Sequence, residues 1–460
     1  MSTQTAGSAD LSPTPGQGIR LSGYISTAAI SVANIVAVVA VTGILARAFS
    51  EDQFLLYGKA NRYMNFLFCI TNGSLGYAIV RYGSFGDESK RKQVLFNALC
   101  LVGGLTLLVS ATVRFSIDEI ATALNEPRFS RGWMIYCSLW LFGQSFLHII
   151  LAYLRSSSQL TLANKVHWTS KTLCILSAAS IIWIMSQWVQ APLSVPQYYG
   201  LVGVLVTTTC ILAFASQWKN LEPTLNPKLC GHMIGFSSTR IVDALLKNSF
   251  LVVVLTLLGR HSPASARIAG QVAVITFLLR GIEALCQPLV MLVMTDSLAK
   301  DSKERIRRMV ETGWIALATF TLPMMLVLFM LCEPIVKLYL GTRFQGLGEE
   351  FGIISLSLLP TVAVVLFRGH LDGKLKISPI MYANILGVLA IGSITWYLLE
   401  QNTVTLRTIA WSIVAIRWLQ FVFVMWLLNR MFGVIPYRRE AVLQVWTKLQ
   451  TLVRKIRSRG

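Results

Sequence analysis

Three basic residues lie near the middle of long apolar segments, where a charge is costly to bury: Lys247, Arg280 and Arg417. Ionisable groups in such segments face the interior of a helical bundle or a water-filled cavity, where they pair with one another or bind a ligand. A guanidinium group also matches the oxygens of a phosphate or carboxylate through two parallel hydrogen bonds. The chemistry that these residues could provide is therefore the binding of an anion.

Two of these basic residues, Lys247 and Arg280, have an acidic residue one helical turn away, Asp243 and Glu283. Two triads each share one helix face: Arg240, Asp243 and Lys247 in one segment, and Arg280, Glu283 and Gln287 in the next. Both faces should point at protein or water. Asp243 and Glu283 could bind no ligand and simply neutralise their neighbours, which lowers the cost of burying the bases. Both interpretations stay open.

Arg417 differs because no acidic residue lies within a helical turn of it along the sequence. Its nearest polar neighbour on the helix is Gln420. We therefore expect its partner to come from another helix or from a ligand, which makes Arg417 the leading candidate for substrate contact.

The first half of the chain carries a weaker polar stripe. Gln144, His148 and Arg155 fall at i, i+4 and i+11 on one helix face, and Asn34 lies within the first apolar segment. His148 could carry a proton near neutral pH, or it could be a hydrogen-bonded packing residue. Lys59, Arg62 and Arg81 bracket the second segment, where they either extend to the membrane interface or steer a phosphate.

The elements that position these residues are expected to be membrane-spanning helices. Only 13% of residues are charged, yet the formal net charge is +20. A run of about 20 apolar residues crosses a hydrocarbon core of ~30 Å at ~1.5 Å per helical residue, and lipid forbids unsatisfied backbone. The sequence predicts an all-α polytopic membrane protein with about twelve transmembrane helices. These spans are placed at 22–45, 54–80, 93–113, 132–154, 168–189, 198–216, 236–258, 268–294, 309–332, 349–368, 378–399 and 406–428.

The distribution of positive residues predicts the orientation. With the N-terminus inside, the cytoplasmic segments hold more than twice as many lysines and arginines as the outer segments, so both termini are expected to be cytoplasmic. Residues 1–20 read as a disordered tail without a cleavable signal. Residues 429–460 form a basic amphipathic tail, expected to lie on anionic membrane lipids. A protein partner for this tail stays open; nucleic acid is not expected.

The spans divide into two lobes of six helices. The predicted domains are an N-terminal lobe at 21–216, a cytoplasmic linker at 217–235 and a C-terminal lobe at 236–428. A charged loop follows the second span (DESKRKQV, 87–94) and the eighth (KDSKERIRRMV, 300–310), although charged loops can resemble each other by chance. Parallel repeats related by a pseudo-two-fold axis along the membrane normal are a transporter design, with the substrate path between the halves.

The remaining motifs exclude several classes of protein. None of the eight cysteines lies at metal-ligand spacing from another, so no metal or cofactor is expected. The sequence has no HExxH, P-loop or GxSxG motif in a suitable context, which argues against an ATPase or a hydrolase. The longest predicted outer loops, near 114–131 and 333–348, are too short for a catalytic domain.

Three stretches resemble a known family: ILARAFSEDQFLLYG at 44–58, LGYAIVRYG at 75–83 and EPIVKLYLGTRFQG at 333–346. They are similar to the end of the first helix, the end of the second and the outer loop after the ninth in the polysaccharide or O-antigen lipid flippases of the multidrug/oligosaccharidyl-lipid/polysaccharide exporter superfamily. The chain departs from the family pattern at Ala48, Phe49 and Ser50, where a Leu-Gly pair is usual.

The resemblance implies a flippase of the bacterial cytoplasmic (inner) membrane. Such a protein moves a glycan on an undecaprenyl-diphosphate carrier to the outer leaflet by alternating access, in surface polysaccharide biosynthesis such as that of O-antigen or exopolysaccharide. It implies a polysaccharide polymerase and other assembly proteins as partners. The residues expected to contact the substrate are Arg417, Arg280, Lys247, Arg240 and Arg62; those expected to form a polar or coupling network are Asp243, Glu283, His148, Gln144 and Asn34.

Two other functions remain open. A multidrug or cation-coupled exporter of the same fold would be expected to place carboxylates in the spans of the first half, and the predicted spans there contain none. A non-transporting glycan-assembly protein or a glycan-processing enzyme ranks third, because the chain lacks a catalytic motif and a large outer domain.

Overall fold

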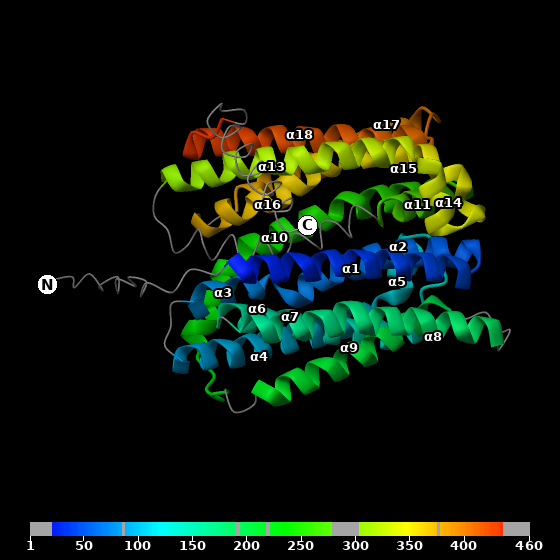
Figure 1. The fold of residues 1–460 in the computed structure, drawn as a ribbon. Helices are drawn as coiled ribbons and strands as arrows, with labels where there is room; N and C mark the ends of the chain where they lie inside the picture. The colour runs from blue at the N-terminus through cyan, green and yellow to red at the C-terminus, as the bar shows by residue number, and fades with distance from the viewer. Residues whose placement is uncertain are drawn as a thin grey trace, which may run out of the picture.

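The computed structural model describes residues 21–84, 88–157, 159–188, 194–217, 221–277, 303–374 and 378–435, and these residues form helices joined by short turns (Figure 1). The prediction of an all-α architecture is confirmed. The helices of the first half are α1 (Leu21–Ala48), α2 (Glu51–Asn72), α3 (Leu75–Ser84), α4 (Glu88–Phe115), α5 (Ile117–Ala123), α6 (Arg131–Ser156), α7 (Leu160–Trp168), η1 (Thr169–Leu173), α8 (Cys174–Trp188) and α9 (Val195–Gln217).

The second half repeats the pattern of long helices with short connections. Its helices are α10 (Pro227–His261), α11 (Pro263–Ile275), α13 (Lys303–Met330), α14 (Cys332–Leu340), η3 (Thr342–Leu347), α15 (Gly348–Ser355), α16 (Leu358–Lys374), α17 (Ile380–Glu400) and α18 (Leu406–Phe432). α10 begins at Pro227, inside the segment predicted as a linker, because Asn226 caps the helix and Pro227 occupies its first turn.

Eight helices in the described residues are long and apolar enough to cross a membrane, and one bent pair makes a ninth. The other three predicted spans coincide with α1, with α2 and α3 together, and with α11, which covers the described part of 268–294. The bent pair joins residues 342–355 to 358–371 at an angle of 49°. Each predicted span therefore has a helix among the described residues, although 54–80 and 349–368 are broken and 268–294 is described only as far as residue 277.

The second predicted span, 54–80, is interrupted between α2 and α3. Gly73 and Ser74 both adopt a positive φ, of 57° and 51°, and the Gly73 amide donates back to the carbonyls of Cys69 and Ile70. A left-handed residue ends a helix in this way, and glycine accepts the conformation without a steric penalty. The span is therefore two helices, and α3 starts in a new direction.

Residues 160–188 form one continuous span that contains a π-helical turn at Thr169–Leu173. The span begins eight residues before the predicted start at 168. Lys171, which the predicted boundary placed at a membrane face, is the twelfth residue of a 29-residue helix, roughly 16 Å from its first turn. π-turns of this kind frequently occur at functional sites.

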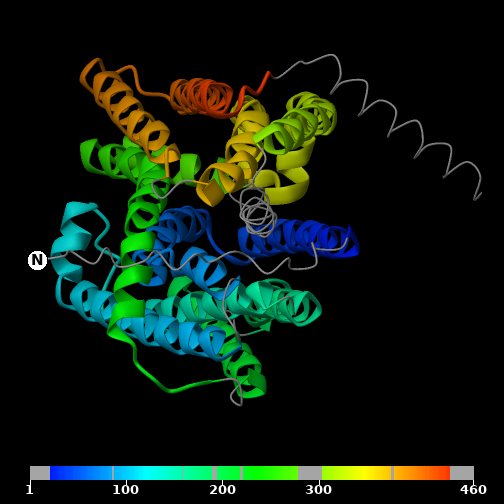
Figure 2. The same cartoon turned by 90° about the vertical axis from the view of Figure 1, so that its left-hand side faces the viewer.

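The helices group into two lobes. In both views α13 and α15–α18 lie together on one side, α4 and α6–α9 on the other, and α1, α2 and α10 between them (Figures 1 and 2). α10 packs against α17 and α11 of its own half and against α2 and α3 of the first half. It is therefore placed to connect a site in the second lobe with the interface between the lobes.

Candidate functional site

A buried carboxylate on α10 organises the polar centre of the second lobe. Asp243 has no exposed surface; its Oδ2 lies 2.7 Å from Nη2 of Arg368 on α16, and its Oδ1 accepts a 2.7 Å hydrogen bond from Nδ2 of Asn384 on α17. Three helices therefore meet at one carboxyl group. The charge of Asp243 is balanced across helices, by an arginine that the predicted boundaries had placed at a span end.

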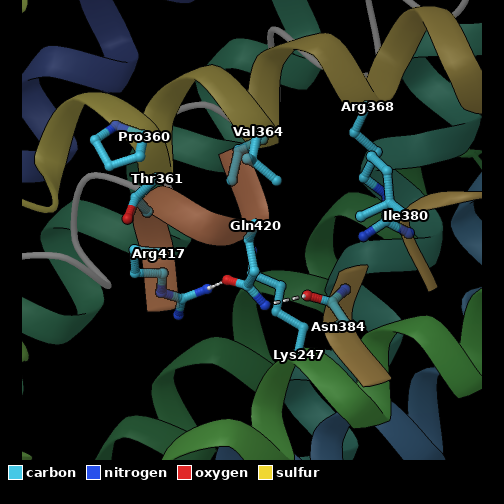
Figure 3. A pocket seen from close by; sticks show the side chains of 10 residues that line it. Lys247, Pro360, Thr361, Val364, Arg368, Ile380, Asn384, Arg417 and Gln420 are labelled. Atoms are coloured by element: carbon cyan, nitrogen blue, oxygen red, sulfur yellow. Dashed lines mark hydrogen bonds between the residues drawn. The ribbon is translucent and has the colours of Figure 1, made fainter. Parts of the chain in front are cut away.

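The network continues from Asn384 to α18 (Figure 3). Nε2 of Gln420 donates to Oδ1 of Asn384 at 3.3 Å and to the Ala383 carbonyl at 3.2 Å, and Nη1 of Arg417 donates to Oε1 of Gln420 at 3.0 Å. The guanidinium of Arg417 also lies over the Phe250 ring of α10, 4.6 Å from its centroid. Another helix thus contacts Arg417 through the Phe250 ring, while Gln420, its predicted neighbour on α18, accepts its hydrogen bond.

These side chains surround a pocket between α10, α16, α17 and α18. Its charged lining residues are Lys247, Arg368 and Arg417, and none of its lining residues is acidic. The pocket leaves ≈ 20 Å³ for the centres of water molecules. A water needs ~10–15 Å³ by this measure, so the pocket has room for about one water in this conformation. A larger ligand would require the helices to separate.

The first lobe contains a second polar centre, formed by α1, α6 and the π-turn. Gln144 of α6 is buried and its Oε1 accepts a hydrogen bond from Nζ of Lys171. The neighbouring Thr172 donates its hydroxyl to Oδ1 of Asn34 on α1. The structure thus brings together two predicted residues, Gln144 and Asn34, and adds Lys171.

His167 connects Arg155 to the same centre. Nη2 of Arg155 lies 3.3 Å from Nδ1 of His167, and the other ring nitrogen, Nε2, lies 3.3 Å from the Asn34 amide. Arginine can only donate, so Nδ1 is the acceptor in its contact with Arg155. This contact holds His167 neutral, because a doubly protonated ring would point an N–H at the guanidinium.

The two polar centres differ in how their cations are balanced. Among the described residues, the ion pairs include Arg368 with Asp243 in the second lobe but none that joins Arg155 or Lys171 to a carboxylate. The partners of these two cations are the neutral side chains of His167 and Gln144. Their positive charge is therefore not neutralised by the described part of the first lobe.

The remaining predicted residue of the polar stripe in the first lobe, His148, packs against a glycine. A Cβ atom on Gly76 of α3 would lie 2.6 Å from Cε1 of His148, and the Phe68 ring lies edge-on at 6.0 Å between centroids. Gly76 thus permits the close approach of α3 to the imidazole. The side chain is thus closely packed, but Nδ1 of His148 forms no hydrogen bond with the described residues, so the hydrogen bond expected of a packing histidine is not observed.

Arg62 joins the two lobes. It is 1% exposed, and its Nη2 donates to Oγ1 of Thr276 at 2.7 Å and to the Ala273 carbonyl at 3.2 Å, both on or next to α11. Its guanidinium lies 5.4 Å from the centroid of Phe277, and Tyr57 of α2 stacks on the same ring at 5.5 Å. We call these contacts the α2–α11 seal. The interpretation of Arg62 as a residue that extends to the interface is wrong, because the side chain is buried between helices.

Arg240 is fully buried beside an aromatic ring. Its guanidinium lies 3.7 Å from the Phe236 centroid, and Nη1 donates to the Phe236 carbonyl at 3.0 Å. Arg81 of α3 also lies over this ring, at 4.7 Å. The ring face is the negative end of its quadrupole, so it stabilises both cations. Arg280, Glu283 and Gln287 lie outside the described residues.

Sequence reasoning missed five members of the two centres: His167, Lys171, Thr172, Arg368 and Asn384. The predicted span began only at 168, which left His167 outside it and Lys171 and Thr172 near its end, whereas the helix begins at Leu160. Arg368 was likewise the last residue of a predicted span, but α16 continues to Lys374. Asn384 is a single amide side chain within an apolar run, and this pattern could have identified it as a buried polar residue of the site.

The fold is that of the MATE transporters. The eukaryotic MATE transporter AtDTX14 superposes with a TM-score of 0.67 at 13% sequence identity, covering 92% of this chain and 99% of that chain. An inward-facing multidrug resistance MATE family transporter of the MOP superfamily gives 0.63 at 12% identity, covering 88% of this chain and 94% of that chain. An outward-facing one gives 0.61 at 11% identity, covering 89% and 94%. The architecture of two six-helix lobes is confirmed.

The sequence itself matches a family. No curated protein matches the chain. Residues 44–349, most of the chain, match the family described as polysaccharide biosynthesis protein. The matched region runs from the end of α1 to the start of α15, so it contains Gln144, Arg155, His167 and Lys171 of the first polar centre. The chain therefore belongs to the polysaccharide biosynthesis protein family and shares the fold of the MATE structures.

Proposed function

We propose that the protein is a flippase that moves a glycan linked to undecaprenyl diphosphate across the bacterial cytoplasmic membrane. The observation that carries the proposal is the polar centre of the first lobe, where Arg155 at the end of α6 and Lys171 within the span 160–188 have neutral partners. A buried cation that no acid neutralises is costly. A bound anion would remove that cost.

A diphosphate group matches the donors that remain. Arg155 directs one N–H at His167 and Lys171 one N–H at Gln144, while both side chains are only partly buried. The remaining N–H groups can therefore reach a ligand. Arginine binds phosphate oxygens through its planar fork and lysine through a point charge, and together they can neutralise two negative charges.

The pocket of the second lobe provides a second set of cations for the same substrate. Lys247, Arg368 and Arg417 line it, and Arg417 is our proposed contact for the carrier phosphate in that lobe. Because the pocket has room for about one water in this conformation, the substrate would enter only after the lobes rearrange. This requirement agrees with alternating access, in which the two lobes, proposed as residues 21–216 and 236–428, rock against each other.

A cation-coupled multidrug exporter is the second candidate, and Asp243 favours it. A buried carboxylate can bind a proton or a metal cation, and several structures of the same fold are multidrug transporters. Against this function, both oxygens of Asp243 already face Arg368 and Asn384. A coupling cation would have to displace an arginine that lies 2.7 Å away.

The test compares the leaflets of cells that carry variants of the first-lobe site. Arg155→Gln and Lys171→Gln should each reduce the lipid-linked glycan in the outer leaflet by about tenfold to a hundredfold, the range for one charge-assisted hydrogen bond. Lys165→Gln removes an exposed charge from the span 160–188 that also holds Lys171, and should export normally. Normal export by well-folded Arg155→Gln and Lys171→Gln variants would exclude this site from the substrate path.

The thermal stability of the Lys171→Gln variant distinguishes a role of Lys171 in binding from a role in the fold. Because no described carboxylate pairs with Lys171, replacing it with glutamine leaves no charge stranded, and the thermal unfolding midpoint should stay unchanged or rise. A fall in both midpoint and export would instead indicate that Lys171 serves the fold.

A further inference from the structure

A basic cleft lies at the end of α1 that is remote from the polar centres. α1, α14 and η3 enclose it, and it leaves ≈ 550 Å³ for the centres of water molecules, far more than the pocket of the second lobe. Arg47, Lys337 and Arg343 line it together with Thr342 and Leu338. One cation thus comes from each of the three elements.

Backbone contacts hold two of these cations in place. Arg47 donates through Nη1 to the Gly43 carbonyl and through Nη2 to the Leu338 carbonyl, both at 2.9 Å. Arg343 donates through Nη1 to the Phe49 carbonyl at 3.2 Å. Arg47 and Arg343 therefore connect the end of α1 to residues 338–343 by hydrogen bonds, and these bonds fix the shape of the cleft. Carbonyl oxygens orient a guanidinium but do not neutralise it.

The lining residues include no acid. Glu333 stands one helical turn before Lys337, but in the described residues it forms no ion pair with it and packs against Gly348. Glu51, which begins α2, is paired with Arg267 at 2.7 Å. The three cations of the cleft therefore keep a net positive charge, and the cleft selects for an anion.

The surface beside the cleft is apolar. Leu338 is 79% exposed, and Met330 and Leu331 at the junction of α13 and α14 are 71% and 49% exposed. In a membrane protein such a surface contacts acyl chains. A positive cleft with an adjoining apolar surface matches a molecule that has a phosphate at one end and hydrocarbon at the other.

We propose that this cleft binds the headgroup of an anionic phospholipid, with the phosphate between Lys337 and Arg343 and the acyl chains along Leu338. In the topology with a cytoplasmic N-terminus, the cleft belongs to the outer leaflet. The cleft shares no residue with the two polar centres, and the proposal stands whether or not the protein moves a glycan. A lipid bound there would join α1 of the first lobe to α14 of the second.

The experiment measures lipid-dependent thermal stabilisation of the purified full chain in detergent. Phosphatidylglycerol is titrated against the parent protein and Lys337→Gln/Arg343→Gln, which keeps the contacts of Arg47. The apparent affinity should fall about thirtyfold in the variant, roughly fivefold for each charge removed near a lipid surface. Arg114→Gln/Arg260→Gln removes two exposed arginines elsewhere and should bind like the parent.

Three further measurements identify the type of ligand and test whether the variant is folded. Phosphatidylcholine, which is zwitterionic, should stabilise the parent less than phosphatidylglycerol. Inorganic phosphate should have little effect, and stabilisation equal to that by phosphatidylglycerol would assign the cleft to a soluble anion and overturn the proposal. Lys337→Arg/Arg343→Lys keeps the charge and should bind phosphatidylglycerol. Equal affinity of the parent and the Lys337→Gln/Arg343→Gln variant would also overturn it.

Discussion

A buried arginine can be balanced by an acid or held by neutral groups, and the consequences of removing its partner differ. Arg368 lies beside the carboxylate of Asp243, whereas Arg155 contacts a neutral imidazole. Removing one partner of a buried ion pair leaves an uncompensated charge, which typically costs ~3–5 kcal/mol. Removing a neutral partner costs only the hydrogen bond.

The first prediction follows for Asp243. Asp243→Asn keeps the shape of the side chain but strands the charge of Arg368, so the thermal unfolding midpoint in detergent should fall clearly. Asp243→Asn/Arg368→Gln removes both charges and should recover most of the loss. If the double variant is no more stable than Asp243→Asn, the pair does not account for the burial of either residue.

The second prediction concerns Arg417, the proposed phosphate contact on α18. Arg417→Lys keeps a charge but loses the planar fork, so it should retain part of the export activity, and Arg417→Gln should retain little. Arg430→Gln, at an exposed position of the same helix, is the matched control. Leaflet-resolved measurement of the lipid-linked glycan checks the order. Full export by a well-expressed Arg417→Gln protein would contradict the assignment.

At the scale of elements, glycines set how closely the helices approach each other. A Cβ atom on Gly387 of α17 would lie 2.3 Å from Nε2 of Gln420, the residue that joins Arg417 to Asn384. On the same helix, a Cβ on Gly392 would meet only Val253 at 3.4 Å, an ordinary contact. The absence of a side chain at Gly387 is therefore what lets α18 complete the network.

The third prediction uses this contrast within α17. Gly387→Ala should displace Gln420 and lower the thermal midpoint, because the steric conflict outweighs the ~1 kcal/mol that alanine gains over glycine in a helix. Gly392→Ala has no conflict and should leave the midpoint unchanged or raise it. An equal response of the two variants would show that Gln420 can move without loss.

The positions of the spans could be predicted from the sequence, whereas contacts between distant helices could not. The length of the apolar runs located the spans that the structure describes, because lipid imposes this length. In the triad on α10, Arg240 and Asp243 are fully buried and Lys247 lines the pocket of the second lobe. Helix ends were harder to predict. The helix begins with the polar stretch Leu160–Trp168, and its apolar part follows. The prediction began the span at the apolar part, so Lys171 was placed at a membrane face. The partner of Asp243 lies on α16, and no local pattern in one sequence specifies a contact between distant helices.

At the scale of the whole molecule, orientation remains a prediction that reporter tags can check. Tags after residue 435 and in 221–226 should be cytoplasmic, and tags in 124–130 and 341–347 should be external, because positive residues are retained inside. An external tag after residue 435 would reverse the arrangement. It would also move the basic cleft to the inner leaflet.

The last prediction concerns the α2–α11 seal, which joins α2 of the first lobe to α11 of the second. A Cβ atom on Gly58 of α2 would lie 3.2 Å from Cβ of Ala273 on α11, close to the separation that a disulfide requires. Gly58→Cys/Ala273→Cys, in a background without the native cysteines, should therefore cross-link under mild oxidation. If the lobes must part at this seal to release substrate, the oxidised protein should not export glycan.

The controls distinguish the effect of the disulfide from the effect of the two substitutions themselves. Each single cysteine variant should export with and without oxidant, and reduction should restore export by the double variant. Gel mobility after protease cleavage in the segment between α9 and α10 reports the cross-link directly. Sustained export by fully cross-linked protein would mean that the lobes separate elsewhere. Arg62, Tyr57 and Phe277 would then form a permanent contact between the lobes, and the path of the substrate would have to open between other helices.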